Sequence, residues 1–441
     1  MLKACLRYVA WLALPALAMP AFAAERPLLL THATVIDGTG GPAQAGMTVA
    51  IDGERIAAIY PDGSRAAPKA ARVENLRGRY VIPGLIDAHV HLTAAEPDIG
   101  HYQTHLQALV RGGVTAVRDM AGDDRLLAYL AGQANADLIA APDIFYVALM
   151  AGPTFFAEDV RAQEASAGVP PGTAPWMQAI TPDTDLALAV AEAKGTGATA
   201  LKLYANLPPE LVAKITAEAH RQGLQVWSHA TIFPTRPSQA VAAGVDVISH
   251  SPYLVWEAVA QVPDDYRVRA LGDFTHIPPD APAILALFHT MQQRGTILDA
   301  TLWPFAEEAR RHPEKVGAGI VPWSYAVTRL AHQHGVRVAA GTDSSGLPAT
   351  ARGGKLTGMP LIHAEMAALV AHCGFTPMQA IQAATAVGAA AIGQATQRGT
   401  IEVGKRADLV VLAADPTRDI HNTTRIVFVV KNGHVYRKGG A

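Results

Sequence analysis

The sequence predicts an α/β protein, a (β/α)8 barrel of the TIM type with a small β-sandwich built from the N- and C-terminal segments. Over residues 81–397, short apolar runs that end in polar residues alternate with alanine-rich helical stretches, a pattern typical of parallel strands joined by crossover helices. Over residues 24–80 and 398–441, turn residues separate short apolar runs, which indicates hairpins. We therefore expect these two terminal segments to meet in one composite β domain.

The individual elements follow from local signals. Asp52-Gly53 in the first β segment and Asn432-Gly433 in the last both favour a two-residue hairpin turn. Between them lie eight candidate strands, the number that closes a TIM-type barrel. The third is the weakest, because Pro142 directly precedes it. The predicted strands cover residues 85–91, 115–120, 143–150, 198–204, 225–229, 246–250, 296–302 and 336–343.

The composition indicates an ordinary globular protein without a strongly charged surface. Of the 441 residues, 50% are hydrophobic, which is enough for a large buried core. Lysine and arginine number 36 and aspartate and glutamate 38, so the formal net charge is −2. These totals imply no basic surface, and we expect no nucleic acid as a partner.

Residues 1–23 have the pattern of a secretory signal peptide. Lys3 and Arg7 precede an apolar stretch, and residues 21–23 offer the small-x-small pattern of a cleavage site. An uncleaved membrane anchor is the alternative, but Pro15 interrupts the stretch, which is shorter than the roughly 20 residues that span a bilayer. We expect a secreted protein, periplasmic or extracellular, without stable membrane insertion.

Residues that can bind a metal end several of the predicted barrel strands. His89 and His91 are two apart on the first strand, so both imidazoles point to the same side and can reach one ion. Three other strands end in His229, His250 and Asp343. Because the carboxyl ends of barrel strands meet at one face, the sequence predicts a metal site there.

Two further residues belong to this expected face. Lys202 lies near the end of the fourth strand, where the other side chains converge. Asp87, on the same side of the first strand as His89, is expected to orient a histidine rather than to bind the metal. The Pro- and Gly-rich segments 152–176 and 262–281 follow the third and sixth strands, so we expect them to cover the active face and to select the substrate.

In their order along the chain, these motifs resemble those of the amidohydrolase superfamily of metal-dependent hydrolases, and within it the prolidase-like and imidazolonepropionase-like branch. The residues that carry the resemblance are VIPGLIDAHVHL, GGVTAVRDM, ALKLY, SHA at 228–230, GVDVISH, AAGTDSS and GTIEVGKRADLVVLAADP. The resemblance extends from about residue 28 to residue 437 and implies the same barrel with an appended β-sandwich.

The resemblance implies a binuclear centre. One divalent ion would bind His89, His91 and Asp343, a second would bind His229 and His250, and Lys202 would bridge the two as a carbamate formed with carbon dioxide. Such nitrogen and oxygen ligands favour Zn²⁺, with Mn²⁺ or Co²⁺ as alternatives. Asp343 would also act as the catalytic base and acid. Tyr204, two residues beyond Lys202, would bind the substrate and stabilise an oxyanion.

The function expected from this centre is hydrolysis of a carbon–nitrogen amide bond by a metal-bridging hydroxide. A small amide or peptide, such as an Xaa-Pro dipeptide or an N-acyl amino acid, would be the substrate. The alternative enzyme is a mononuclear cyclic amidohydrolase or deaminase of the imidazolonepropionase type, against which Lys202 argues, because one metal needs no bridge. A non-catalytic barrel scaffold is a remote alternative and would lack ligands. In the sequence, no arginine cluster marks a pocket for a substrate carboxylate. The sequence does not decide between a monomer and a homo-oligomer.

Overall fold

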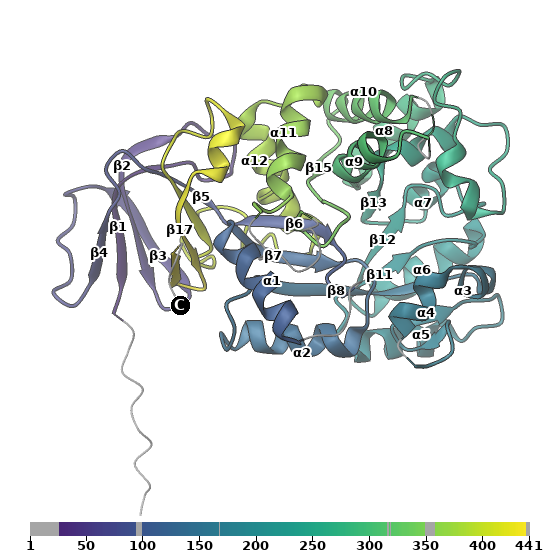
Figure 1. Cartoon of the computed structure of the whole chain (residues 1–441), viewed down its shortest axis with the longest axis horizontal. Coiled ribbons are helices and arrows are strands. Elements are labelled where there is room, and N and C mark those ends of the chain that lie inside the picture. The colour runs from purple at the N-terminus through teal and green to yellow at the C-terminus, as the bar shows by residue number, and fades with distance from the viewer. Residues whose placement is uncertain are drawn as a thin grey trace, which may run out of the picture.

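Eight parallel strands form a nearly closed barrel (Figure 1). In order around the barrel they are β6 (Leu85–Val90), β7 (Val114–Asp119), β8 (Asp143–Ala151), β11 (Ala200–Leu203), β12 (Gln225–His229), β13 (Val247–Ser249), β14 (Ile297–Asp299) and β15 (Val338–Ala339). Between the last strand and the first there is no full ladder: the segment that follows β15 returns to β6 through a bridge between Val90 and Ser344 and through backbone hydrogen bonds such as His91 N–H to the Ser344 carbonyl at 2.8 Å. The predicted barrel is confirmed, including its third strand, because a proline just before a strand removes no ladder donor.

The computed structural model describes residues 26–93, 99–166, 168–314, 317, 319–348 and 358–437. The predicted signal peptide, residues 1–23, lies outside the described residues. Within these ranges, no helix is both long enough and apolar enough to cross a bilayer.

Most barrel strands end one or more residues earlier than predicted, and left-handed residues stand close after the ends of β13 and β14 and four residues after the end of β15. His250, Thr301 and Asp343 have φ angles of 77°, 47° and 44°. This left-handed conformation is incompatible with an extended strand, so β13 and β14 cannot extend past His250 and Thr301, and the segment after β15 cannot continue as a strand through Asp343. Each non-glycine residue held in this way costs about 1–3 kcal/mol, which the surrounding structure must offset.

Helices follow the strands and cover the outside of the barrel (Figure 1). In α6, for example, Leu211, Val212, Ile215 and Ala219 share one buried face, as an amphipathic helix requires. The covering helices are α1 (Ile99–Arg111), α2 (Asp124–Asn135), α5 (Leu186–Gly195), α6 (Pro209–Arg221), α7 (Pro237–Ala242), α8 (Pro282–Arg294), α9 (Leu302–Arg311), α10 (Ile320–Gln333), α11 (Ile362–Cys373), α12 (Pro377–Ala383) and α13 (Ala386–Ala391).

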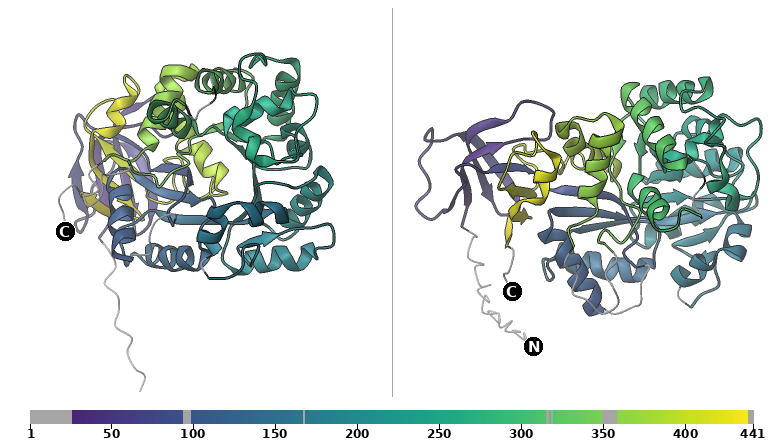
Figure 2. Two further views of the ribbon diagram at one scale, coloured as in Figure 1. Left: turned by 45° about the vertical axis from the view of Figure 1, so that its right-hand side comes forward. Right: turned by 45° about the horizontal axis from the view of Figure 1, so that its top comes forward.

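The terminal segments form a second, mixed sheet beside the barrel, as Figure 2 shows. Its strands are β1 (Leu28–Val35), β2 (Gln44–Asp52), β3 (Arg55–Pro61), β4 (Arg72–Asn75), β5 (Tyr80–Pro83), β16 (Leu409–Leu412), β17 (Ile426–Lys431) and β18 (His434–Arg437). Both predicted hairpins are present, with Gly53 between β2 and β3 and Asn432-Gly433 between β17 and β18. Strand β16 pairs with β5, so the C-terminal strands extend the N-terminal sheet.

A buried ion cluster attaches this sheet to the amino-terminal end of the barrel. Lys431 Nζ, at the end of β17, lies 2.7 Å from the carboxylate of Asp143, the first residue of β8. Arg398 pairs with Asp143 and also with Asp408, whose carboxylate is 3.2 Å away. All four side chains are buried. Removing one partner from such a cluster leaves an uncompensated charge and costs about 3–5 kcal/mol, so the cluster strongly favours one docking geometry.

Two insertions lie at the opposite, carboxyl-terminal end of the barrel. The first follows β8 and contains α3 (Pro153–Glu158), α4 (Val160–Ser166), β9 (Thr173–Ala174) and β10 (Met177–Ala179). The second follows β13 and contains the 3₁₀ helices η1 (Ser251–Glu257) and η2 (Tyr266–Leu271). Both contribute residues to pockets beside the predicted metal ligands, as expected for covering loops.

Candidate metal centre

One pocket of about 110 Å³ at the carboxyl end of the barrel collects the whole predicted ligand set. Its lining includes His89, His91, Lys202, His229, His250 and Asp343, together with Tyr204. These residues are far apart in the sequence and come from the ends of β6, β11, β12, β13 and β15. The barrel therefore brings them together as the carboxyl ends of parallel strands do.

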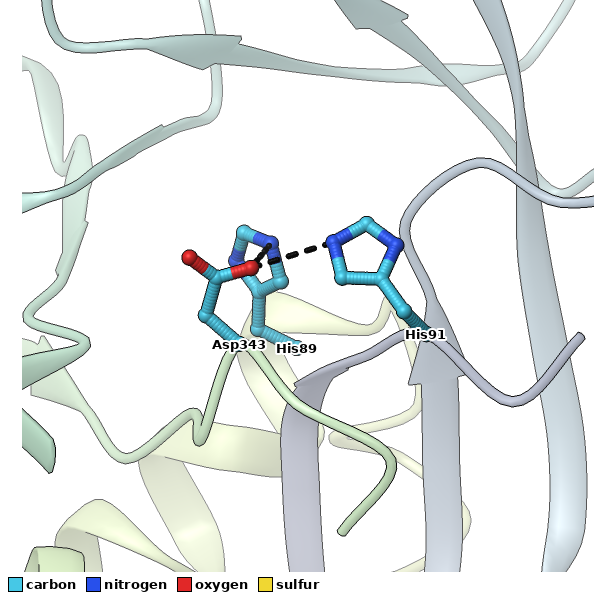
Figure 3. Close-up of side chains that lie close together, drawn as sticks. All are labelled: His89, His91 and Asp343. Atoms are coloured by element: carbon cyan, nitrogen blue, oxygen red, sulfur yellow. Dashed lines mark hydrogen bonds and ion pairs between the residues drawn. The ribbon is translucent and has the colours of Figure 1, made fainter. Parts of the chain in front are cut away.

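His89, His91 and Asp343 form the tightest group in the pocket (Figure 3). One carboxylate oxygen of Asp343 lies 3.0 Å from Nε2 of His91 and 3.3 Å from Nε2 of His89. The group's ligand atoms all lie within 4.8 Å of one another, so one ion could contact two imidazoles and a carboxylate. Burial disfavours the charged imidazole, but the carboxylates of Asp343 and Asp299 outweigh it and raise the pKa of His89 to about 9.

His229 and His250 form the other wall of the pocket. Their ring centroids are 4.6 Å apart, and His250 Nδ1 lies 3.7 Å from the second carboxylate oxygen of Asp343. Burial holds the pKa of both histidines well below the usual value, so both are neutral imidazoles at neutral pH. A neutral imidazole has the lone pair that a metal ligand needs.

Asp299 orients His89, and the sequence did not single it out. Its carboxylate is buried and lies 2.6 Å from Nδ1 of His89, which leaves Nε2 directed at the pocket. Gly341 makes room for this contact, because a Cβ there would lie 2.4 Å from the Asp299 carboxylate and 2.7 Å from His89 Cβ. The available signal was an aspartate near the end of an otherwise apolar strand, the same signal that identified the other ligands.

Asp87 was predicted to orient a histidine, and that prediction is wrong. Its carboxylate instead accepts hydrogen bonds from the backbone N–H of Thr342, from the Thr342 hydroxyl at 2.7 Å and from the backbone N–H of His89. Burial raises the pKa of Asp87 to about 7 despite these hydrogen bonds. Asp87 therefore fixes the backbone that carries Asp343.

Lys202 is fully enclosed in the pocket wall. It is 1% exposed, and its Nζ donates to the Ser249 hydroxyl at 3.3 Å. Burial lowers the pKa of Lys202 to about 8, although the carboxylates of Asp299 and Asp343 oppose this shift. A lysine with this pKa supplies more neutral amine at neutral pH than a solvated one, and the neutral amine is the form that reacts with carbon dioxide.

Tyr204 stands at the mouth of the pocket. Its ring centroid lies 4.1 Å from that of His229, and its hydroxyl accepts a hydrogen bond from Arg161 Nη2 at 3.1 Å. Arg161 and Arg269, which come from the two insertions, also line the pocket. Sequence patterns gave no reason to select either arginine.

The donor set fits divalent metal ions. Four imidazoles and an anionic carboxylate converge on one small pocket. The carboxylates of Asp343 and Asp299 raise the pKa of His89, so the proton on His89 balances negative charge that a bound cation could balance instead. Zn²⁺ binds histidine nitrogen and carboxylate oxygen in this way. His89, His91, His229, His250 and Asp343 are therefore the residues that would hold the metal, with Lys202 beside them.

Replacing Asp299 with alanine should lower metal affinity by about 10- to 100-fold, because His89 loses the partner that fixes its ring orientation. The measurement is competition for zinc with a chromophoric chelator. Asp124→Ala is the matched control, because Asp124 is equally buried but bonds the Thr196 hydroxyl outside the pocket. Equal affinities for the wild type and Asp299→Ala would contradict the assigned role.

The chain is similar to known proteins over most of its length. The model of the amidohydrolase family matches residues 80–436. Imidazolonepropionase from Mesorhizobium japonicum is 25% identical over 413 residues, which cover 86% of this chain and 89% of that protein. A solved putative prolidase from Bifidobacterium longum has a TM-score of 0.69 at 25% identity, covering 95% of this chain and 96% of that chain.

A solved Xaa-Pro dipeptidase with bound methionine has the same fold, with a TM-score of 0.69 at 22% identity, covering 93% of this chain and 100% of that chain. The family match covers most of the sequence, and a His-His-Asp cluster that could hold a metal lies at the carboxyl end of the barrel. This chain therefore belongs to the amidohydrolase family, and it is a hydrolase that acts on carbon–nitrogen bonds.

Proposed function

We propose that the protein is a secreted, binuclear amidohydrolase that cleaves the amide bond of a small substrate, such as a dipeptide or an N-acyl amino acid. The observation that carries this proposal is the single pocket that contains both the histidine and carboxylate ligands and a buried lysine. Two divalent ions bound there, Zn²⁺ by preference, would supply Lewis acidity that makes water nucleophilic and polarises a carbonyl.

Lys202 is the bridge in this proposal. An ammonium group has no lone pair and would be repelled by two dications, so the buried lysine must change its charge to share the pocket with them. Reaction of the amine with carbon dioxide forms an N–C bond, releases a proton and leaves an anionic carbamate with two oxygen donors. Together with Asp343, that carbamate would give the pocket two anionic ligands among four neutral imidazoles.

Asp343 is the group that would move the proton. Its contacts with His89 and His91 outweigh burial and keep its pKa well below the usual value, so it is an anion at neutral pH. Its side chain is 25% exposed, which makes it accessible to water in the pocket. It would accept the proton of the attacking water and deliver it to the leaving nitrogen as the C–N bond breaks.

Tyr204 would stabilise the substrate oxygen during this attack. Because Arg161 donates to the Tyr204 oxygen, the tyrosine's own hydroxyl hydrogen is directed elsewhere and can donate to the developing oxyanion. The products are a carboxylic acid and an amine, and the atoms of one water account for the difference between them and the amide.

The decisive experiment measures metal per chain in protein produced with zinc and bicarbonate. We expect about two ions in the wild type and about one or none in Lys202→Ala, because the bridge is lost. Isotopically labelled bicarbonate should give a carbamate carbon signal in the wild type and none in Lys202→Ala. Lys194→Ala, which removes an exposed lysine on α5, is the control.

About one metal in both proteins would contradict the bridge. It would favour the alternative of a mononuclear hydrolase of cyclic amides or a ring deaminase, to which the similarity with imidazolonepropionase also points.

Tyr204→Phe should lower kcat by about 100- to 1,000-fold and change KM little, because a donor to the oxyanion acts mainly in the transition state. Steady-state kinetics on the best amide substrate measure this. Tyr146→Phe is the control, since that buried hydroxyl bonds the Thr196 carbonyl away from the pocket. An unchanged kcat in Tyr204→Phe would remove the residue from the mechanism.

Secretion is tested by the mass of the mature protein. If residues 1–23 are a signal peptide, protein recovered from the periplasm or medium begins at Ala24. Intact-mass spectrometry reports the start directly. An intact N-terminus on protein that stays in the cytoplasm would contradict secretion and leave the proposed chemistry untouched.

A further inference from the structure

Two arginines from separate insertions meet at the candidate metal centre. Arg161 lies on α4, after the third barrel strand, and Arg269 lies on η2, after the sixth. Both line the same pocket of about 110 Å³ as the six candidate ligands. The pocket that contains the candidate metal ligands therefore also presents two guanidinium groups. Two such cationic side chains indicate a substrate with an anionic group.

Asp159 and Tyr266, which bond each other, hold the two arginines in place. Asp159 accepts hydrogen bonds from Arg161 Nε at 2.9 Å and from the Tyr266 hydroxyl at 2.7 Å. The guanidinium of Arg269 lies over the Tyr266 ring, 5.1 Å from its centroid. Tyr266 thus joins the two insertions and fixes both guanidinium groups, so the pair is preorganised before any ligand binds.

Arg161 retains hydrogen-bond donors that can reach a ligand. Its Nε and Nη2 bond Asp159, and Nη2 also donates to Tyr204. Its Nη1 makes no hydrogen bond with any residue in the described part of the chain. A guanidinium has five N–H donors in a planar fork, and the remaining ones match a carboxylate.

A larger, mainly apolar cavity of about 650 Å³ adjoins the metal pocket. The two cavities share His91, Met120, Arg161, Tyr204 and Asp343. The rest of the larger cavity includes Leu92, Leu149, Phe155, Met177, Leu347 and Pro348. Arg161 lies where the two cavities join, and Arg269 lines the metal pocket, so a substrate whose amide lies at Asp343 could contact both arginines with a carboxylate and extend an apolar group into the larger cavity.

We propose that Arg161 and Arg269 bind a substrate carboxylate and that the adjoining cavity receives an apolar acyl group, so that the substrates are N-acyl amino acids with a large apolar acyl chain. This inference rests on the proposed amide hydrolysis and narrows its substrate class. It also assigns the two insertions their role, since each supplies one arginine and the first supplies much of the apolar wall.

The test compares decanoate release from N-decanoyl amino acids with release from the matching carboxamides, and N-decanoyl with N-acetyl substrates. The wild type should prefer the carboxylate series by about 10- to 100-fold, the effect of hydrogen bonds to a charged group. It should prefer decanoyl over acetyl by at least about 10-fold, because the longer chain buries more apolar surface.

Arg161→Met and Arg269→Met should each reduce the carboxylate preference and retain bound metal. Arg269→Met should act mainly through KM, whereas Arg161→Met should also lower kcat on both series, because it removes the hydrogen bond that directs the Tyr204 hydroxyl. Arg267→Met is the matched control: Arg267 lies on the same 3₁₀ helix as Arg269 but forms exposed pairs with Asp265 and Glu158. Its carboxylate preference should equal that of the wild type. Metal content and thermal melting confirm that each variant is folded.

The outcomes separate this inference from the proposed function. Release of decanoate from both series at equal rates, in the wild type and in both arginine variants, would overturn the carboxylate site and keep amide hydrolysis. Equal rates for decanoyl and acetyl substrates would overturn the apolar acyl site. No release of acyl groups from any substrate by zinc-loaded wild type would instead contradict the proposed amide hydrolysis itself.

Discussion

The Asp343 carboxylate is the charge around which the carboxyl end of the barrel is organised. It contacts His89, His91 and His250, so it connects the ends of the first, sixth and eighth strands. A carboxylate in such a pocket is stable only when donors or cations surround it. This requirement accounts for the converging imidazoles, for the left-handed backbone at Asp343 and for the hydrogen bonds from Thr342 to Asp87 that hold this segment.

Buried charges stabilise the structure at one end of the barrel and line a pocket at the other. At the amino-terminal end, the buried cluster of Asp143, Arg398, Asp408 and Lys431 attaches the terminal sheet and contributes to stability. At the carboxyl-terminal end, buried charges face a pocket and are available to a ligand. This division is general for TIM-type barrels, in which strand ends on one face carry the chemistry and those on the other carry stability.

Barrel strands and the longer insertions contribute different residues to the site. The candidate metal ligands come from strand ends, whose positions the barrel fixes. The arginines come from insertions that are linked to each other through Asp159 and Tyr266. Such a design lets the insertions change the substrate while the reacting groups stay in place.

The barrel and its candidate metal ligands could be predicted from the order of residues alone. Strand and helix periodicity are local properties, and His89, His91, Lys202, His229, His250 and Asp343 could be found because each lies at or near the end of a recognisable strand. That Asp299, not Asp87, bonds the His89 ring became visible only in the folded chain, because both are aspartates on apolar strands and differ only in the groups that they face. Only the tertiary structure brought Arg161 and Arg269 to one pocket, since no periodic pattern specifies where side chains on irregular insertions point.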